Sequence, residues 1–160
     1  MKKIRIGVSR CLLGDPVRYD GETKRNAVVS DILSTRFELV PVCPEVEFGM
    51  SIPREAIELQ GNPETPRLIG LESGTDFTDG MQTWCRERVK KLEMENLHGF
   101  IFKCRSPSCG LIFQEQYRGL FARTFMDAFP GLPVTDEEGL ANPEWREKFI
   151  ARVSNHRENC

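Results

Sequence analysis

The chain has 160 residues, of which 39% are hydrophobic and 29% are charged, and its formal net charge is -2. This composition excludes a disordered chain, and the slightly acidic balance argues against a non-specific nucleic-acid binder. No apolar run approaches the ~20 residues of a membrane helix. The first residues lack the apolar core and cleavage site of a signal peptide, so we expect a cytoplasmic protein with no membrane partner.

Short apolar segments that alternate with helical patterns predict an α/β fold. In chain order we expect a strand at 4–8, a helix at 26–34, a strand at 37–42, a helix from Thr78 or Asp79 to a stop at Gly99, a strand at 100–103, a helix at 120–129, a strand at 132–135 and a helix at 143–153. The strands are β-branched or aromatic, whereas the helices repeat their apolar residues near the helical period. Such alternation is typical of a mostly parallel sheet with helices on its faces, and we expect a single domain over 1–160.

The segment 50–74 interrupts this alternation. It contains three prolines and the turn sequence Gly61-Asn62-Pro63. Residues 56–60 and 67–71 are predicted to pair as a hairpin across that turn. We interpret the segment as an insertion over the edge of the sheet, and two readings of it are open: a lid on a site, or a surface arm without a chemical role.

Three of the predicted strands are followed by a cysteine. Cys11 lies three residues after the first strand, and Cys43 directly follows the second. Cys104 directly follows the third strand, and Cys109 lies five residues further on. Because the carboxyl ends of parallel strands gather along one edge of a sheet, where ligands bind, we expect these cysteines to converge on one site.

The residue types at this edge favour a metal centre with sulfur ligands. Both histidines lie away from the cysteines, which disfavours a mixed His/Cys zinc site, and no CxxC pair marks a structural zinc or a dithiol centre. Dispersed cysteines suit an iron–sulfur cluster, in which three ligands would leave one iron open as a Lewis acid. Thiol–disulfide chemistry is the alternative that these residues leave open.

Other candidate functional side chains lie beside the cysteines. Glu45 lies two residues after the second cysteine and is a candidate general base. Ser106 and Ser108 precede the last cysteine and offer hydroxyls that could bind substrate or relay a proton. Arg18 and Lys103, near the first and last cysteine loops, could bind an anionic part of a substrate. Each of these residue types is also common in solvated turns.

Three cysteine-bearing motifs carry a resemblance to a known family. They are 9–14 with 17–21, then 41–46 with Gly49 and Pro53-Arg54, and finally 106–110. In these motifs the sequence resembles the thiouracil desulfidase family, and the resemblance covers nearly the whole chain. It implies a Rossmann-like, three-layer α/β fold with a mostly parallel sheet, to which the small hairpin or lid would be inserted.

The resemblance also implies a cofactor, a reaction and a set of site residues. It implies a [4Fe-4S] cluster held by Cys11, Cys43 and Cys109, with one open iron. The implied activity is a desulfidase that removes sulfur from thiolated uracil bases, nucleosides or nucleotides as sulfide, without net redox change. Glu45 and Ser106 match the catalytic positions. The expected partner is thus a small thiolated pyrimidine or its nucleotide, with no stable nucleic-acid complex.

Cys104 has no counterpart among the implied ligands. We expect it to be a spare thiol facing the core, because a fourth thiolate would close the open iron and leave Glu45 and Ser106 nothing to act upon. Two other classes of function stay open on the sequence: an iron–sulfur or thiol redox sensor without turnover, and a zinc-stabilised binding module.

Overall fold

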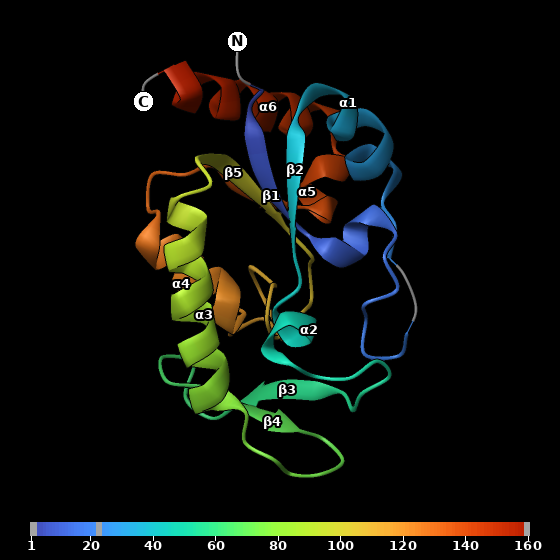
Figure 1. Ribbon diagram of the computed structural model, residues 1–160, viewed down its shortest axis with the longest axis vertical. Coiled ribbons are helices and arrows are strands. Elements are labelled where there is room, and N and C mark those ends of the chain that lie inside the picture. Colours follow the sequence, from blue (N-terminus) through green and yellow to red (C-terminus); the bar gives the residue numbers. More distant parts are fainter. Residues whose placement is uncertain (1–2, 22–23, 159–160) are drawn as a thin grey trace.

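The computed structural model describes residues 3–21 and 24–158, and its centre is a four-stranded sheet in the order β2-β1-β5-β6. The strands are β1 (Arg5–Ser9), β2 (Glu38–Val42), β5 (Leu97–Phe102) and β6 (Val134–Asp136). Every neighbouring pair in this sheet runs parallel. The predicted α/β fold with a mostly parallel sheet is therefore confirmed (Figure 1).

Helices form a layer on each face of this sheet. One layer contains α3 (Thr78–Glu93) and α4 (Leu120–Ala128), and the other contains the π-helix η2 (Val28–Leu33), α5 (Glu137–Ala141) and α6 (Pro143–Glu158). A 3-10 helix, η1 (Arg10–Leu13), follows β1, α1 (Ser34–Arg36) continues η2, and α2 (Pro44–Phe48) follows β2. Among the described residues, every helix is too short or too polar to cross a bilayer.

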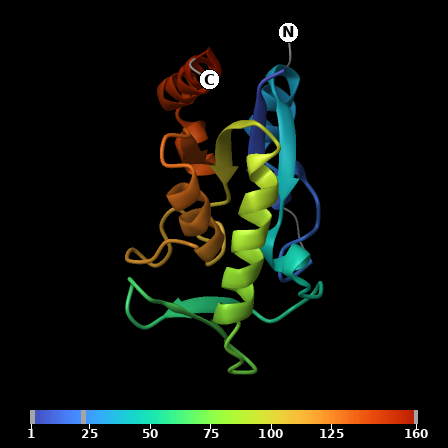
Figure 2. The same cartoon turned by 60° about the vertical axis from the view of Figure 1, so that its left-hand side comes forward.

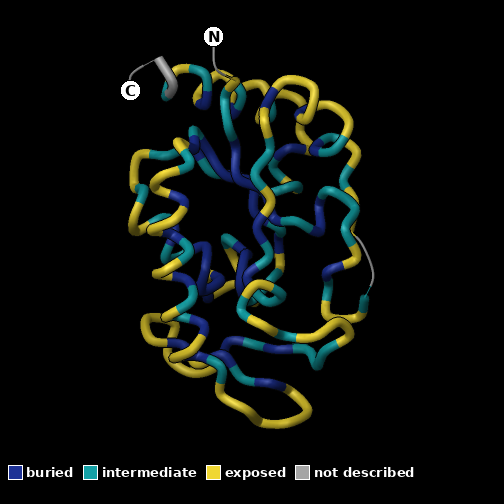
Figure 3. Tube along the Cα trace, viewed as in Figure 1, coloured by how far each residue is buried: buried dark blue, intermediate teal, exposed yellow. Residues whose placement is uncertain are grey.

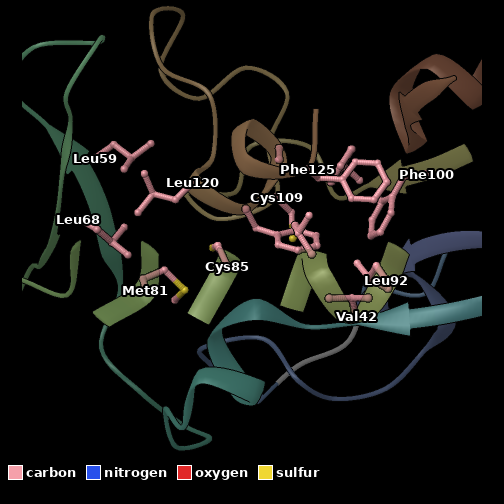
Figure 4. Packing of buried hydrophobic residues seen from close by; sticks show 14 of the residues in the cluster. Val42, Leu59, Leu68, Met81, Cys85, Leu92, Phe100, Cys109, Leu120 and Phe125 are labelled. Carbon is pink, nitrogen blue, oxygen red and sulfur yellow. The ribbon is translucent and has the colours of Figure 1, made fainter. Parts of the chain in front are cut away.

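Successive residues of β5 pack against the helix layers on opposite faces of the sheet. Phe100 packs against Phe125 of α4, with the two ring centroids 4.8 Å apart (Figure 4). It also contacts Phe121 of the same helix. The next residue, Ile101, belongs to the buried cluster on the opposite face, as expected for a strand. The neighbouring strand supplies Gly7 here, because a Cβ at that position would lie 2.3 Å from the Phe100 ring.

The predicted hairpin is present, and it is part of the core. β3 (Ile57–Gln60) pairs antiparallel with β4 (Arg67–Gly70). Leu59 and Leu68 are buried in the same cluster as the inner face of α3. Figure 2 shows the hairpin across the end of the molecule opposite the two termini, and Figure 3 shows buried residues on its strands and exposed ones at its turns.

The start and the end of α3 differ from the prediction. The helix begins at Thr78, but the Thr78 hydroxyl accepts a hydrogen bond from the β4 backbone and so does not cap it. Asp76 instead accepts from the Thr78 N–H at 2.9 Å, and Asp79 lies within the first turn. The helix ends at Glu93, before the expected stop at Gly99, which lies inside β5.

The first predicted helix also has a different form. In place of a single helix at 26–34, the chain forms η2 followed by the one-turn helix α1. Asn26 accepts from the Val29 N–H through its side chain, which satisfies one of the free donors at the start of this element. Two short helices, α2 and α5, were not predicted at all; each has five residues, too few to show a period.

Candidate functional site

A cavity of about 200 Å³ opens at the carboxyl ends of β1, β2 and β5. The loops that follow these three strands line it, together with side chains from 17–19 and from 54–57. Cys11, Cys43 and Cys109 all line this cavity, as the order of the strands led us to expect. The inserted segment contributes Arg54, Ala56 and Ile57 to its wall, so part of the insertion borders the site.

Each cysteine is placed by a short local structure at the end of a strand. Cys11 lies on η1 directly after β1 and is 9% exposed. Cys43 precedes α2, where Pro44 is the first helical residue, and the Cys43 N–H donates to Glu47 Oε2 at 2.8 Å. Cys109 is 5% exposed and belongs to the buried cluster between β5 and α4 (Figure 4). The three thiols therefore reach the cavity from three separate loops.

Burial keeps these thiols protonated when no metal is bound. It raises the pKa of Cys11 to about 11 and raises the pKa of Cys43, against smaller opposing effects of Lys103 and of the Val46 backbone N–H. Burial also raises the pKa of Cys109 far above that of an ordinary thiol, and the charges of Cys43 and Cys11 raise it further.

The donor set at the cavity consists of cysteine thiols. Among residues 3–21 and 24–158, no group of three or more His, Cys, Asp or Glu side chains is arranged to hold one metal ion. In a cubane cluster each thiolate binds a different iron, so the ligands are spaced more widely than around one ion. Three cysteines on separate loops line one cavity, and their sulfur-only chemistry is of the kind that suits an iron–sulfur cluster.

Glu45 lies on α2 and its carboxylate is held at both oxygens. Arg54 Nε donates to Glu45 Oε1 at 2.9 Å, and Ser108 Oγ donates to Glu45 Oε2 at 3.2 Å. The Glu45 side chain is 14% exposed and lines the cavity. Glu45 thus lies on the cavity wall, where a carboxylate is a candidate general base.

The two serines before Cys109 occupy different environments. Ser106 lines the cavity, and its Oγ accepts the backbone N–H groups of Ser108 and Cys109 at 3.2 and 3.0 Å. Because both contacts use its oxygen as acceptor, the hydroxyl hydrogen is free to face the cavity. Ser108 is fully buried, is not among the cavity-lining residues, and contacts Glu45. Its direct contact with substrate stays a prediction.

The two basic residues predicted to bind substrate both line the cavity. Lys103 Nζ contacts Glu137 Oε2 at 3.0 Å and donates to the Cys104 carbonyl at 2.8 Å. The Arg18 guanidinium lies 5.8 Å from the centre of the Tyr19 ring, and its nearest carboxylate, Asp20, is 3.6 Å away. Arg18 thus holds its carboxylate more loosely than Lys103 does.

That Cys104 is a spare thiol stays a prediction. The residue is buried, but it lines the cavity and belongs to neither hydrophobic cluster. Its Sγ lies 3.5 Å from Lys103 Nζ and 3.5 Å from Glu138 Oε1, and its N–H donates to Glu137 Oε1 at 2.6 Å. Burial, followed by the charge of Glu137, raises the pKa of this thiol to about 11. The Cys104 thiol therefore has polar neighbours at the end of the strand.

Sequence reasoning gave no role to Arg54, which contacts Glu45 directly. Arg54 belongs to the Pro53-Arg54 pair of the second motif, so the sequence held a signal that could have marked it as a site residue. Its place in the site depends on how the segment 50–57 returns to the sheet edge, and no local pattern encodes that path.

These observations define an α/β protein with a cysteine-lined cavity at the carboxyl ends of its parallel strands. The family model for 2-thiouracil desulfurase matches residues 6–137, and the chain belongs to this family. This confirms the resemblance seen in the sequence and supports a desulfidase enzyme.

Two known proteins are similar over most of their length. The uncharacterized protein YbbK of Bacillus subtilis (strain 168) is 31% identical over 122 residues, which cover 73% of this chain and 79% of YbbK. The solved structure of the [4Fe-4S]-dependent thiouracil desulfidase TudS matches with a TM-score of 0.70 at 28% identity, and the match covers 93% of this chain and 99% of TudS. The comparisons thus agree on the family and on the fold.

Proposed function

We propose that this chain is an iron–sulfur-dependent desulfidase that removes sulfur from thiolated uracil compounds and releases it as sulfide. The observation that carries the proposal is the convergence of three cysteines with Glu45 and Ser106 on one cavity, in a chain of the 2-thiouracil desulfurase family. The printed name of TudS gives that relative a [4Fe-4S] cluster and a thiouracil substrate. We assign the same kind of cofactor here, held by Cys11, Cys43 and Cys109.

A cluster with three protein ligands would supply an open iron as a Lewis acid for the thione sulfur. Water attacks the carbon that bears sulfur, and a Glu45 carboxylate oxygen takes the proton from that water. The hydroxyl of Ser106 donates to a ring heteroatom and steadies the developing charge. The carbon–sulfur bond then breaks, so water and thione are converted to carbonyl and hydrogen sulfide without net redox change.

The remaining site residues are proposed to bind and orient the substrate. Arg18 and Lys103 place positive charge on the cavity wall, where a ring carbonyl or a phosphate could accept hydrogen bonds. Ser108 acts on the substrate through Glu45, whose Oε2 it contacts. The substrate class is a thiolated uracil base, nucleoside or nucleotide, and the reducing cytoplasm remains the proposed compartment because the described cysteines are free.

The test is an assay of iron, acid-labile sulfide and sulfide release on anaerobically purified protein. We expect about four irons and four sulfides per chain, and sulfide release from at least one of 2-thiouracil, 4-thiouracil and their nucleosides and nucleotides. Cys11→Ser, Cys43→Ser and Cys109→Ser should each lose the iron. The matched control Cys104→Ser should retain it.

Other outcomes assign the chain to another class. One zinc and no iron, or no metal after anaerobic reconstitution, would contradict the cluster. Iron with a reversible spectral change on oxidation, but with no sulfide release from any thiolated pyrimidine, would favour a redox sensor.

A further inference from the structure

Arg54 is the most buried of the basic side chains that hold a carboxylate at the cavity. Its side chain is 7% exposed, compared with 17% for Lys103 and 24% for Arg18. It comes from the inserted segment, nine residues after Glu45, and lines the cavity. A buried guanidinium needs acceptors for its donors, so its contacts show what it holds in place.

The guanidinium divides its donors among three parts of the chain. Nε donates to Glu45 Oε1 at 2.9 Å, Nη2 to the Val17 carbonyl at 2.9 Å, and Nη1 to the Ser51 carbonyl at 3.2 Å. The Arg54 N–H also donates to the Tyr19 carbonyl at 2.7 Å. Arg54 therefore joins α2, the loop after the first cysteine and the inserted segment at one point beside the cavity.

The contact with Arg54 helps to fix the Glu45 carboxylate on the wall of the cavity. Arg54 holds Oε1 by a charge-assisted hydrogen bond, whereas Ser108 holds Oε2 by a longer bond of 3.2 Å. A carboxylate fixed in this way cannot rotate away from the cavity. Its proton-accepting oxygen is thus placed before a substrate arrives, which is the condition for efficient general-base catalysis.

We propose that Arg54 is a positioning residue that orients Glu45 for proton transfer and closes the 17–19 loop and the inserted segment over the site. The proposal rests on the desulfidase function proposed above. Lysine cannot replace it fully, because one ammonium group does not reproduce three donors fixed in a planar fork. Displacement of a reacting group by about 1 Å can cost roughly 100-fold in rate, which sets the effect we expect.

The test compares Arg54→Met and Arg54→Lys with wild-type holoenzyme, at equal iron content. We expect kcat to fall roughly 100-fold in Arg54→Met with KM changed less than about threefold, and Arg54→Lys to lie between the two. Guanidinium added to an Arg54→Ala holoenzyme should restore part of kcat. The matched control is Arg67→Met, which removes a surface arginine of the same inserted segment, also paired with a carboxylate at 2.9 Å but outside the cavity.

A double-mutant cycle that compares Tm values gives a readout that does not depend on turnover. Arg54→Met should lower Tm in the wild-type background and lower it less in the Glu45→Gln background, because the partner charge is already absent there. Equal losses in the two backgrounds would show that Arg54 acts on the loops alone and would overturn the proposal.

The remaining outcomes separate this inference from the proposed function. If wild-type holoenzyme releases no sulfide from any thiolated uracil, the proposed function fails. If wild type is active and Arg54→Met keeps near-normal kcat, or changes only KM, the positioning role fails while the function stands. If neither Arg54→Met nor Arg54→Lys folds with its iron, Arg54 is a structural residue and the proposal is equally overturned.

Discussion

Each oxygen of the Glu45 carboxylate accepts a hydrogen bond from a different part of the chain, one from Arg54 and one from Ser108. Ser106 is held in a comparable way, since its Oγ accepts two backbone N–H groups of its own turn. The proposed base and the proposed proton donor are therefore both fixed before substrate binds. Such preorganisation avoids the cost of ordering the reacting groups during the reaction.

At this scale the prediction concerns Glu45→Gln and Ser106→Ala. Glutamine keeps the shape of the side chain and an acceptor for Ser108, but it cannot take a proton from water. We expect a loss of about 100-fold or more in kcat for either variant, with iron content and visible spectrum unchanged. The loss in kcat is measured as the rate of steady-state sulfide release at matched iron content.

The controls for these variants lie in the same chain. Glu58→Gln makes the same change on β3, where Glu58 contacts Gln114 outside the cavity, and should leave kcat unchanged. Ser106→Thr keeps the hydroxyl and should retain more activity than Ser106→Ala. Iron loss in Glu45→Gln would instead make that residue part of the structure that holds the cofactor.

At the scale of elements, the sequence predicted the helices, strands and turns that hydrophobic periodicity and turn-forming residues mark locally. The strands and the hairpin of β3 and β4 were predicted with small shifts at their ends, whereas the long helix α3 was predicted at its start but ends at Glu93, well before the expected stop at Gly99. The short helices α2 and α5 were not predicted, because five residues are too few to show a helical period. The contact between Arg54 and Glu45 escaped for another reason: it depends on the path of the inserted segment.

The prediction at this scale tests whether the hairpin is a detached arm or part of the core. Leu68 on β4 is fully buried in the cluster that includes α3, so Leu68→Ala leaves a cavity there. We expect it to lower the free energy of unfolding by about 2–5 kcal/mol, measured by urea denaturation. Leu71→Ala, one residue beyond the strand and 54% exposed, should change it little. Equal, small effects would mean that the hairpin is independent of the core.

At the scale of the whole molecule, the three proposed ligands come from loops that follow β1, β2 and β5. These strands lie side by side in the sheet, although Cys11 and Cys109 are far apart in the sequence. The same three loops line the cavity together with the inserted segment. A cofactor bound to all three would add a further link between loops that are already joined by hydrogen bonds such as that of Ser108 with Glu45.

We therefore expect removal of the cofactor to destabilise the entire fold. A ligand that binds only the native state stabilises it by about 4 kcal/mol when present at 1,000 times its Kd, which corresponds to a Tm change on the order of 10 °C at this size. Anaerobic calorimetry of the loaded protein before and after chelation measures this change. Cys104→Ser should show the same difference as wild type, whereas Cys109→Ser should show a low Tm that chelation does not change. A wild-type Tm that is the same before and after chelation would mean that the cofactor is held by fewer loops than proposed.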